Sequence, residues 1–236
     1  MSMEQASPGN EEKNGDGRIL DQFEIRVLAV LAEKEALTPD NYPLSLNALV
    51  NGCNQLSSRD PVMSISEDTV LDVLHRLMEK KFVSEIKQAG ARVSKYEHRM
   101  RIKWSLEQDK LAALTMLMLR GFQTAGEIRS RSGRLHDFSS IEQLESALEF
   151  LIDKYPPLVA RLARAPGTKE SRYAHLLAGE EELERQETAA GFSSSVVSAA
   201  APRHDRIAQL EEEVGRLRSE VDGIKQEFEN FKKQFE

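Results

Sequence analysis

The side chains best suited to catalysis or metal binding are few in this chain of 236 residues. It has one cysteine and five histidines, at Cys53, His75, His98, His136, His175 and His204. None forms an H-E-x-x-H motif, and the chain lacks G-x-S-x-G, a phosphate-binding P-loop and a dinucleotide-binding glycine pattern. One cysteine makes neither an intrachain disulfide nor a thiolate metal cluster. The sequence therefore predicts no catalytic residues, no metal site and no cofactor, and a protein that is not an enzyme.

Structural roles explain these side chains better. His98 and His175 each stand two positions after a tyrosine in similar segments, so both are interpreted as structural residues of a strand. His136 lies beside Asp137 in a turn, where the pair is expected to cap a helix. Cys53 falls on the apolar face of a predicted helix and is expected in the core.

Nucleic-acid binding would depend on cations near the predicted turns and helix ends. Such residues would contact phosphates with little dependence on base sequence and strong dependence on salt. The candidate DNA-binding residues are Arg76, Lys87, Arg92, Lys95, Arg129, Arg131, Arg134, Arg164, Lys169 and Arg172. The alternative is that these cations pair with acidic groups of the same chain.

The elements that position these residues form an internal repeat. Each copy has an amphipathic helix, over 66–81 or 140–155, followed by a hairpin, over 82–98 or 158–175. Two further helices precede each of these, over 21–35 and 45–55 in the first copy and over 107–119 and 125–130 in the second. Three helices and a hairpin are the order of a winged helix. The predicted fold class is mostly α with small β-hairpins (α+β), as tandem winged-helix domains followed by a coiled-coil helix.

Capping residues set the ends of the repeated helices. Ser66 and Ser140 are predicted N-caps, and Gln143 is predicted to complete a capping box with Ser140. Pro156 and Pro157 are expected to end the second copy of the helix.

In a DNA-binding winged helix, the third helix usually enters the major groove. Its predicted exposed face is mixed in the first copy, with Thr69, Asp72, His75, Arg76, Glu79 and Lys80. In the second copy it is acidic, with Glu142, Gln143, Glu145, Ser146, Glu149 and Asp153. Phosphates repel a close carboxylate by about 1 kcal/mol even in water, so the second helix is not expected to enter DNA.

The link between the second and third helices, Asn51 to Met63, is unusually polar and long. Its side chains Asn54, Gln55 and Arg59 would contact bases or phosphates, or they would build an ordered turn. The structural role is favoured, because Pro61 is typical of an anchored loop.

The C-terminal segment has the apolar spacing of a coiled coil. Apolar residues alternate by three and four positions at Ile207, Leu210, Val214, Leu217, Val221, Ile224, Phe228 and Phe231. In a parallel dimer, glutamates at the g positions of one helix would face cations at the following e positions of the other helix. These attractive pairs favour a homodimer through this segment. The alternative is a helix that packs on its own domains.

Charge and composition set the domain limits. Most of the net charge of −7 lies beyond residue 178, and the two repeats are close to neutral. We expect a disordered tail over 1–18, winged-helix domains over 19–104 and 105–178 with a small core each, a flexible linker over 179–203 and a coiled coil over 204–236. No apolar run is long enough to cross a membrane, and no secretory signal is evident, so a cytoplasmic location is expected.

Several long motifs resemble the YceH-like family. They are LTPDNYPLSLNALV at 37–50, CNQ at 53–55, SRDPVM at 58–63, KYEHR at 95–99, GEIRSR at 126–131 and PGTKESRYAH at 166–175. The resemblance covers about residues 19–178. It implies tandem winged-helix domains, in agreement with the repeat, and it implies no particular biochemical activity.

Two functions fit these observations. The first is a dimeric, DNA-associated regulator that contacts DNA through its basic wings and through the third helix of its first domain. The second is a protein–protein interaction adaptor whose winged-helix domains bind partner proteins. The wing cations and the coiled coil favour the first function, whereas the acidic helix and the near-neutral domains favour the second.

Overall fold

A computed structural model of the protein describes residues 19–87, 93–163 and 170–189. The chain divides into two units, Met1–Val196 and Val197–Glu236, and all described residues belong to the first. The tail predicted over 1–18 and the coiled coil predicted over 204–236, with its dimerisation residues, lie outside the described residues.

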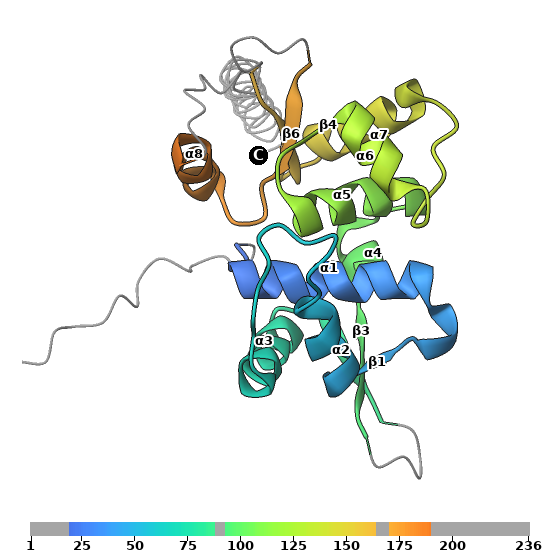
Figure 1. Ribbon diagram of the computed structural model, residues 1–236, viewed down its shortest axis with the longest axis vertical. Helices are drawn as coiled ribbons and strands as arrows, with labels where there is room; N and C mark the ends of the chain where they lie inside the picture. Colours follow the sequence, from blue (N-terminus) through green and yellow to red (C-terminus); the bar gives the residue numbers. More distant parts are fainter. Residues whose placement is uncertain (1–18, 88–92, 164–169, 190–236) are drawn as a thin grey trace, which may run out of the picture. The chain divides into compact units, whose positions relative to one another are not determined.

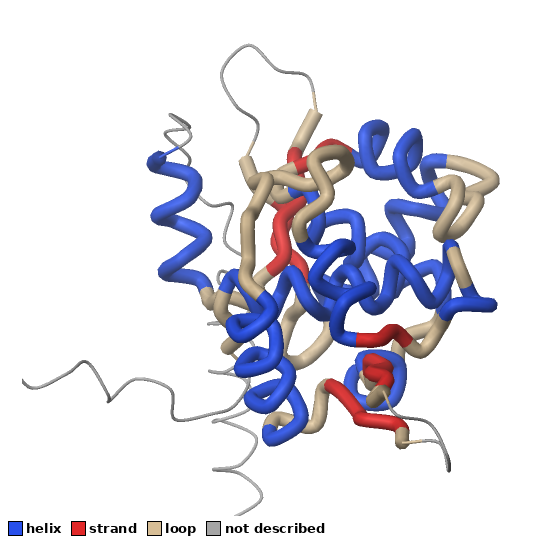
Figure 2. The backbone as a smooth tube through the Cα atoms, turned by 60° about the horizontal axis from the view of Figure 1, so that its bottom comes forward, coloured by secondary structure: helices blue, strands red, loops and turns tan. Residues whose placement is uncertain are grey.

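Two modules with the same order of elements make up the described part (Figure 1). The first contains α1 (Gln22–Leu37), η1 (Pro39–Asn41), β1 (Leu44–Ser45), α2 (Leu46–Cys53), α3 (Glu67–Glu79), β2 (Val83–Ile86) and β3 (Lys95–His98). The second contains α5 (Gln108–Arg120), β4 (Gln123–Thr124), α6 (Ala125–Ser132), α7 (Ile141–Asp153), β5 (Val159–Arg161) and β6 (Arg172–His175). The short helix α4 (Met100–Trp104) joins them, and α8 (Glu180–Ala189) follows the second module. The result is an α+β fold in which the strands are short and the helices dominate (Figure 2).

Each module has a small antiparallel sheet with the same topology. The strand orders are β1-β3-β2 and β4-β6-β5. Val83 pairs with His98 in the first sheet, and Val159 pairs with His175 in the second. The predicted repeat of three helices and a hairpin is therefore present in both modules, and equivalent residues pair in the two hairpins. The third strand of each sheet was not predicted, because two residues are too few to carry an alternating pattern.

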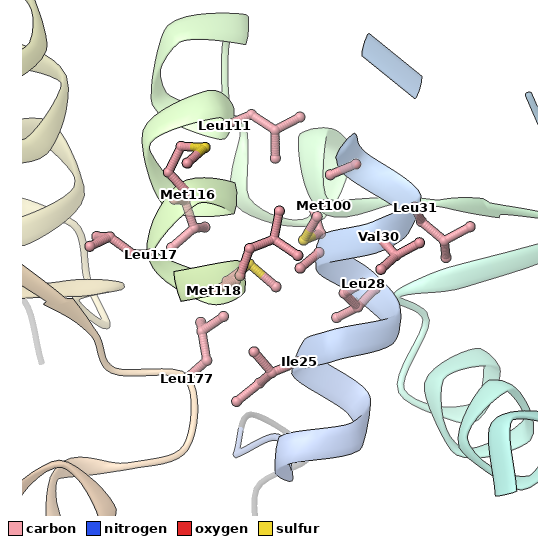
Figure 3. Close-up of a cluster of buried hydrophobic side chains, with 14 of the residues drawn as sticks. Ile25, Leu28, Val30, Leu31, Met100, Leu111, Met116, Leu117, Met118 and Leu177 are labelled. Carbon is pink, nitrogen blue, oxygen red and sulfur yellow. The ribbon is translucent and has the colours of Figure 1, made fainter. Parts of the chain in front are cut away.

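The first helices of the two modules, α1 and α5, pack against each other in the middle of the structure (Figure 1). Met118 of α5 points toward α1, and Leu177 lies beside Ile25 of α1 (Figure 3). Most of the buried apolar residues of both modules form one continuous cluster. The expectation of a separate core in each module is wrong, because α1 and α5 are buried on nearly all sides and pack against one another.

The predicted serine caps are confirmed, but the predicted capping box is not. Ser66 Oγ accepts a hydrogen bond from Thr69 N at 3.2 Å, and Ser140 Oγ accepts one from Gln143 N at 3.3 Å. The Gln143 side chain bonds instead to Ser139, whose backbone N–H lies 2.8 Å from Oε1.

The linker predicted over 179–203 is wrong for its first part, because Glu180–Ala189 form α8. Three glutamates occupy the first turn, where the helix dipole favours negative charge. Leu183 packs with Leu162 and Ala174 in a small cluster of its own. That apolar contact holds the helix against the second module.

Candidate interaction surfaces

His98 connects the first hairpin to α1. Its Nδ1 accepts a hydrogen bond from Met100 N at 3.3 Å, and its Nε2 lies 3.2 Å from Glu35 Oε2. The hydrogen bond from His98 and the guanidinium of Arg101 lower the pKa of Glu35 to about 2, against the effect of burial. The predicted structural role of His98 is confirmed.

His175 occupies the equivalent place in the second module without an equivalent partner. Burial lowers its pKa to about 4, so it is neutral at physiological pH. Its buried Nδ1 has no hydrogen-bond partner among the described residues.

The interpretation of His136 as part of a helix cap is wrong. Ser140 caps α7, and the His136 ring instead packs edge-on against Phe138.

The loop between α2 and α3 is held by a buried arginine. Arg59 Nη2 lies 2.6 Å from Glu33 Oε2, and Arg59 Nη1 lies 3.1 Å from Glu33 Oε1. The same guanidinium donates to the carbonyl of Gly52 and to Gln55 Oε1. Asn54 pairs with the backbone of Ile65 through both its amide atoms. The structural role predicted for this segment is confirmed, and none of these three side chains is left to read bases.

The same loop ties the two modules together. Arg26 of α1 is buried and donates to the carbonyls of Cys53 and Pro61, at 3.2 and 2.6 Å. Asp60 N donates to the carbonyl of Leu119 in α5 at 2.8 Å. Cys53 lies in the core as predicted, and burial raises the pKa of its thiol to about 12, which makes it unreactive.

Both third helices expose carboxylates. On α3 the exposed acidic residues are Glu67, Asp68, Asp72 and Glu79. On α7 they are Glu142, Glu145, Glu149 and Asp153, which follow one another at spacings of three and four residues along one face. The acidic face predicted for α7 is confirmed, and α3 is more acidic at its N-terminal end than the mixed prediction implied.

Most described candidate DNA-binding residues have partners within the chain. Arg76 lies 2.8 Å from Asp21, Lys87 lies 3.2 Å from Glu85, and Arg131 lies 3.2 Å from Glu127. Arg129 donates to the carbonyls of Phe138 and Ser139.

The other candidates have different placements. Lys95 is half-buried in β3, Arg172 is half-buried in β6, and Arg134 is exposed after α6. Arg92, Arg164 and Lys169 lie outside the described residues. The DNA-binding role of the candidates therefore stays a prediction.

Sequence reasoning did not group four cations, Lys80, Lys81, Arg99 and Lys103, which lie on the two chain segments that meet at Phe82. We call this group the Phe82 cation cluster. Its signal in the sequence was the pair of lysines beside an apolar aromatic residue, together with two cations four positions apart. The hairpin brings these two segments together, and helix periodicity alone does not reveal that contact.

Among residues 19–87, 93–163 and 170–189, no group of three or more His, Cys, Asp or Glu side chains is placed to hold a metal ion. In the same part of the chain, no helix is both long and apolar enough to span a membrane.

Fold and surfaces together define a repeated α+β protein with two modules, each of three helices and a three-stranded sheet, joined through one core. A family model described as "Protein of unknown function, DUF480" matches residues 20–168, and the chain belongs to this family. The resemblance to an uncharacterised family is thereby confirmed.

Curated relatives cover most of the chain. A UPF0502 protein of Herminiimonas arsenicoxydans is 63% identical over 212 residues, which are 90% of this chain and 89% of the relative. A UPF0502 protein of Janthinobacterium is 63% identical over 215 residues, 91% of this chain and 90% of the relative. One from Azoarcus is 54% identical over 195 residues, 83% of this chain and 84% of the relative. None of these names specifies an activity.

Proposed function

We propose that the modules are winged-helix domains over 19–104 and 105–178, and that the chain is a non-enzymatic protein–protein interaction adaptor. The partner is a protein with a basic surface, and the contact face is the exposed side of α7. The repeated order of helices and sheet supports the winged-helix assignment. We keep the homodimer through residues 204–236 as part of this proposal.

The observation that carries the adaptor proposal is the row of carboxylates on α7. Four side chains of one sign along a helix would meet DNA phosphates with repulsion of about 1 kcal/mol per close charge in water. The same row suits a basic protein surface, because complementary charge steers association and fixes register.

Exposed apolar side chains lie beside this row. Phe150 is 42% exposed and Tyr155 is 93% exposed. Aromatic side chains carry much of the binding energy in protein interfaces, and a charged rim commonly surrounds them. Basic and apolar groups on one partner would therefore both find contacts on α7.

Internal pairing of the cations supports the same conclusion. Arg76, Lys87 and Arg131 each have a carboxylate partner, so contact with phosphates would compete with bonds the fold already makes. DNA binding remains the second candidate function, and the Phe82 cation cluster is the observation that favours it.

An affinity capture from cell lysate, with and without nuclease, tests the adaptor proposal. The variant replaces Glu145 and Glu149 of α7 by lysine, and the matched control replaces Asp68 and Asp72 of α3 by lysine. We expect wild type and control to capture the same protein after nuclease treatment and the α7 variant to lose it. Capture that nuclease abolishes, or that the α7 variant retains, would refute the proposal.

A further inference from the structure

Two chain segments that carry four cations meet at Phe82, at the base of the first hairpin. Lys103 Nζ lies 4.2 Å from the centre of the Phe82 ring and donates to the carbonyl of Lys80 at 2.5 Å. Arg99 N donates to the carbonyl of Phe82 at 2.7 Å. Lys81 directly precedes Phe82, so the cluster is fixed by the backbone and by one buried ring.

Lys81 has a backbone conformation that usually selects glycine. Its φ is +60°, in the left-handed region. It stands just after the cap of α3, where Lys81 N bonds to Met78 O and Phe82 N bonds to Leu77 O, the two bonds of a Schellman motif. Glycine would adopt this conformation without strain, whereas a lysine does so at a cost. A strained residue that keeps a charged side chain points to a use for that charge.

The cluster has more positive than negative charge. Lys80 Nζ is paired with Glu24 Oε2 at 2.8 Å and bonds to the carbonyl of Ile19. Among the described residues, no ion pair joins the side chain of Lys81 or Arg99 to a carboxylate. Burial and the nearby ammonium groups of Lys81 and Lys80 lower the pKa of Lys103.

Stabilisation of the α3 C-terminus accounts for only part of this arrangement. The helix dipole favours cations at that end, which explains Lys80 and the bond from Lys103 to its carbonyl. It does not explain Arg99, which belongs to a different segment and is exposed. An anionic ligand would account for all four.

We propose that the Phe82 cation cluster binds the phosphate backbone of a nucleic acid without reading its sequence. The side chains of Lys81, Arg99 and Lys103 are exposed, so they suit a chain of phosphates that passes over a surface. Ile102 is exposed beside them, but α4 has only five residues and lacks the broad apolar face with which helices bind membranes. This site is independent of the adaptor proposal, because it lies on the other module.

Fluorescence anisotropy of the full chain with a short DNA duplex at about 50 mM salt tests the site. The first variant is Lys81→Gly with Arg99→Gln, in which glycine removes the charge and suits the left-handed backbone. The second is Arg99→Gln alone. The control is Arg185→Gln, an exposed cation of α8. Thermal melting of each variant verifies that it is folded, and we expect the double variant to melt no lower than wild type, because glycine relieves the left-handed backbone at position 81.

We expect the double variant to bind about 10-fold more weakly, and the slope of log K against log salt to become less negative by about 2, since each lost phosphate contact contributes about 0.9. Arg99→Gln alone is expected to lose about half of that slope, and Arg185→Gln to match wild type. Unchanged binding in the folded double variant would overturn the proposal. So would wild type that binds no DNA but binds vesicles of anionic lipid. Neither result would alter the protein capture by α7.

Discussion

Replacing Arg59 by methionine tests whether the loop between α2 and α3 holds the fold together. The ion pair with Glu33 is buried, with side-chain exposures of 0% for Arg59 and 9% for Glu33. Removing one partner of a buried ion pair costs about 3–5 kcal/mol, because the other charge is left without its partner. Lys34 stays 3.4 Å from Glu33 and offsets part of that charge, so we expect a loss near the lower end, about 3 kcal/mol.

Urea unfolding followed by circular dichroism measures this loss, and the melting temperature should fall by about 10 °C, at 2–4 °C per kcal/mol for a protein of this size. The matched control is Arg185→Met, which breaks an ion pair with Glu182 where Arg185 is 73% exposed. Exposed pairs contribute about 0–1 kcal/mol, so the control should remain close to wild type.

A double variant, Arg59→Met with Glu33→Gln, separates charge from packing. It leaves no unpaired carboxylate in the core and should therefore lose less stability than Arg59→Met alone. If Arg59→Met costs less than 1 kcal/mol, or if it costs no more than Arg185→Met, the reasoning is refuted.

Three further predictions follow from other contacts. Gly52→Ala should lose about 1–3 kcal/mol of stability, because its new Cβ would lie 2.5 Å from Val30 Cγ1, whereas Gly133→Ala meets nothing within 4 Å; chemical unfolding compares the two. Burial lowers the pKa of His175 to about 4, so the neutral form contributes stability that is present above pH 6.5 and is lost as pH falls toward 4. His175→Leu should therefore flatten the pH dependence of unfolding in that window, and an unchanged profile would contradict this assignment. Deleting residues 204–236 should yield monomers by sedimentation, and a truncated chain that remains dimeric would place the interface elsewhere.

The helices and hairpins could be predicted from the sequence because local residue patterns determine them. The serines at 66 and 140 and the apolar spacing after them predicted α3 and α7 within about two residues. The two-residue strands β1 and β4 could not be predicted in this way. Each exists only because it pairs with a distant strand, as Leu44 does with Tyr96.

The burial and pairing of charged side chains were the hardest features to predict from the sequence. Arg26 and Arg59 are buried although arginine is usually exposed, because backbone carbonyls and Glu33 satisfy them. Composition gave Arg76 as a candidate DNA contact, yet its partner Asp21 is far away in the sequence. Which cations are paired and which remain available depends on contacts between segments, and local patterns do not encode these contacts.

The shared core has a consequence for both proposed surfaces. In two domains joined only by a linker, α1 and α5 would each have a solvent-exposed outer face, but they are buried on nearly all sides and pack together. The hydrogen bond from Asp60 N to the carbonyl of Leu119 adds a polar link between the same modules. The α7 face and the Phe82 cation cluster are therefore carried by one packed body. A protein bound at the first and a nucleic acid bound at the second would be held in a fixed relation, which a flexible pair of domains would not provide.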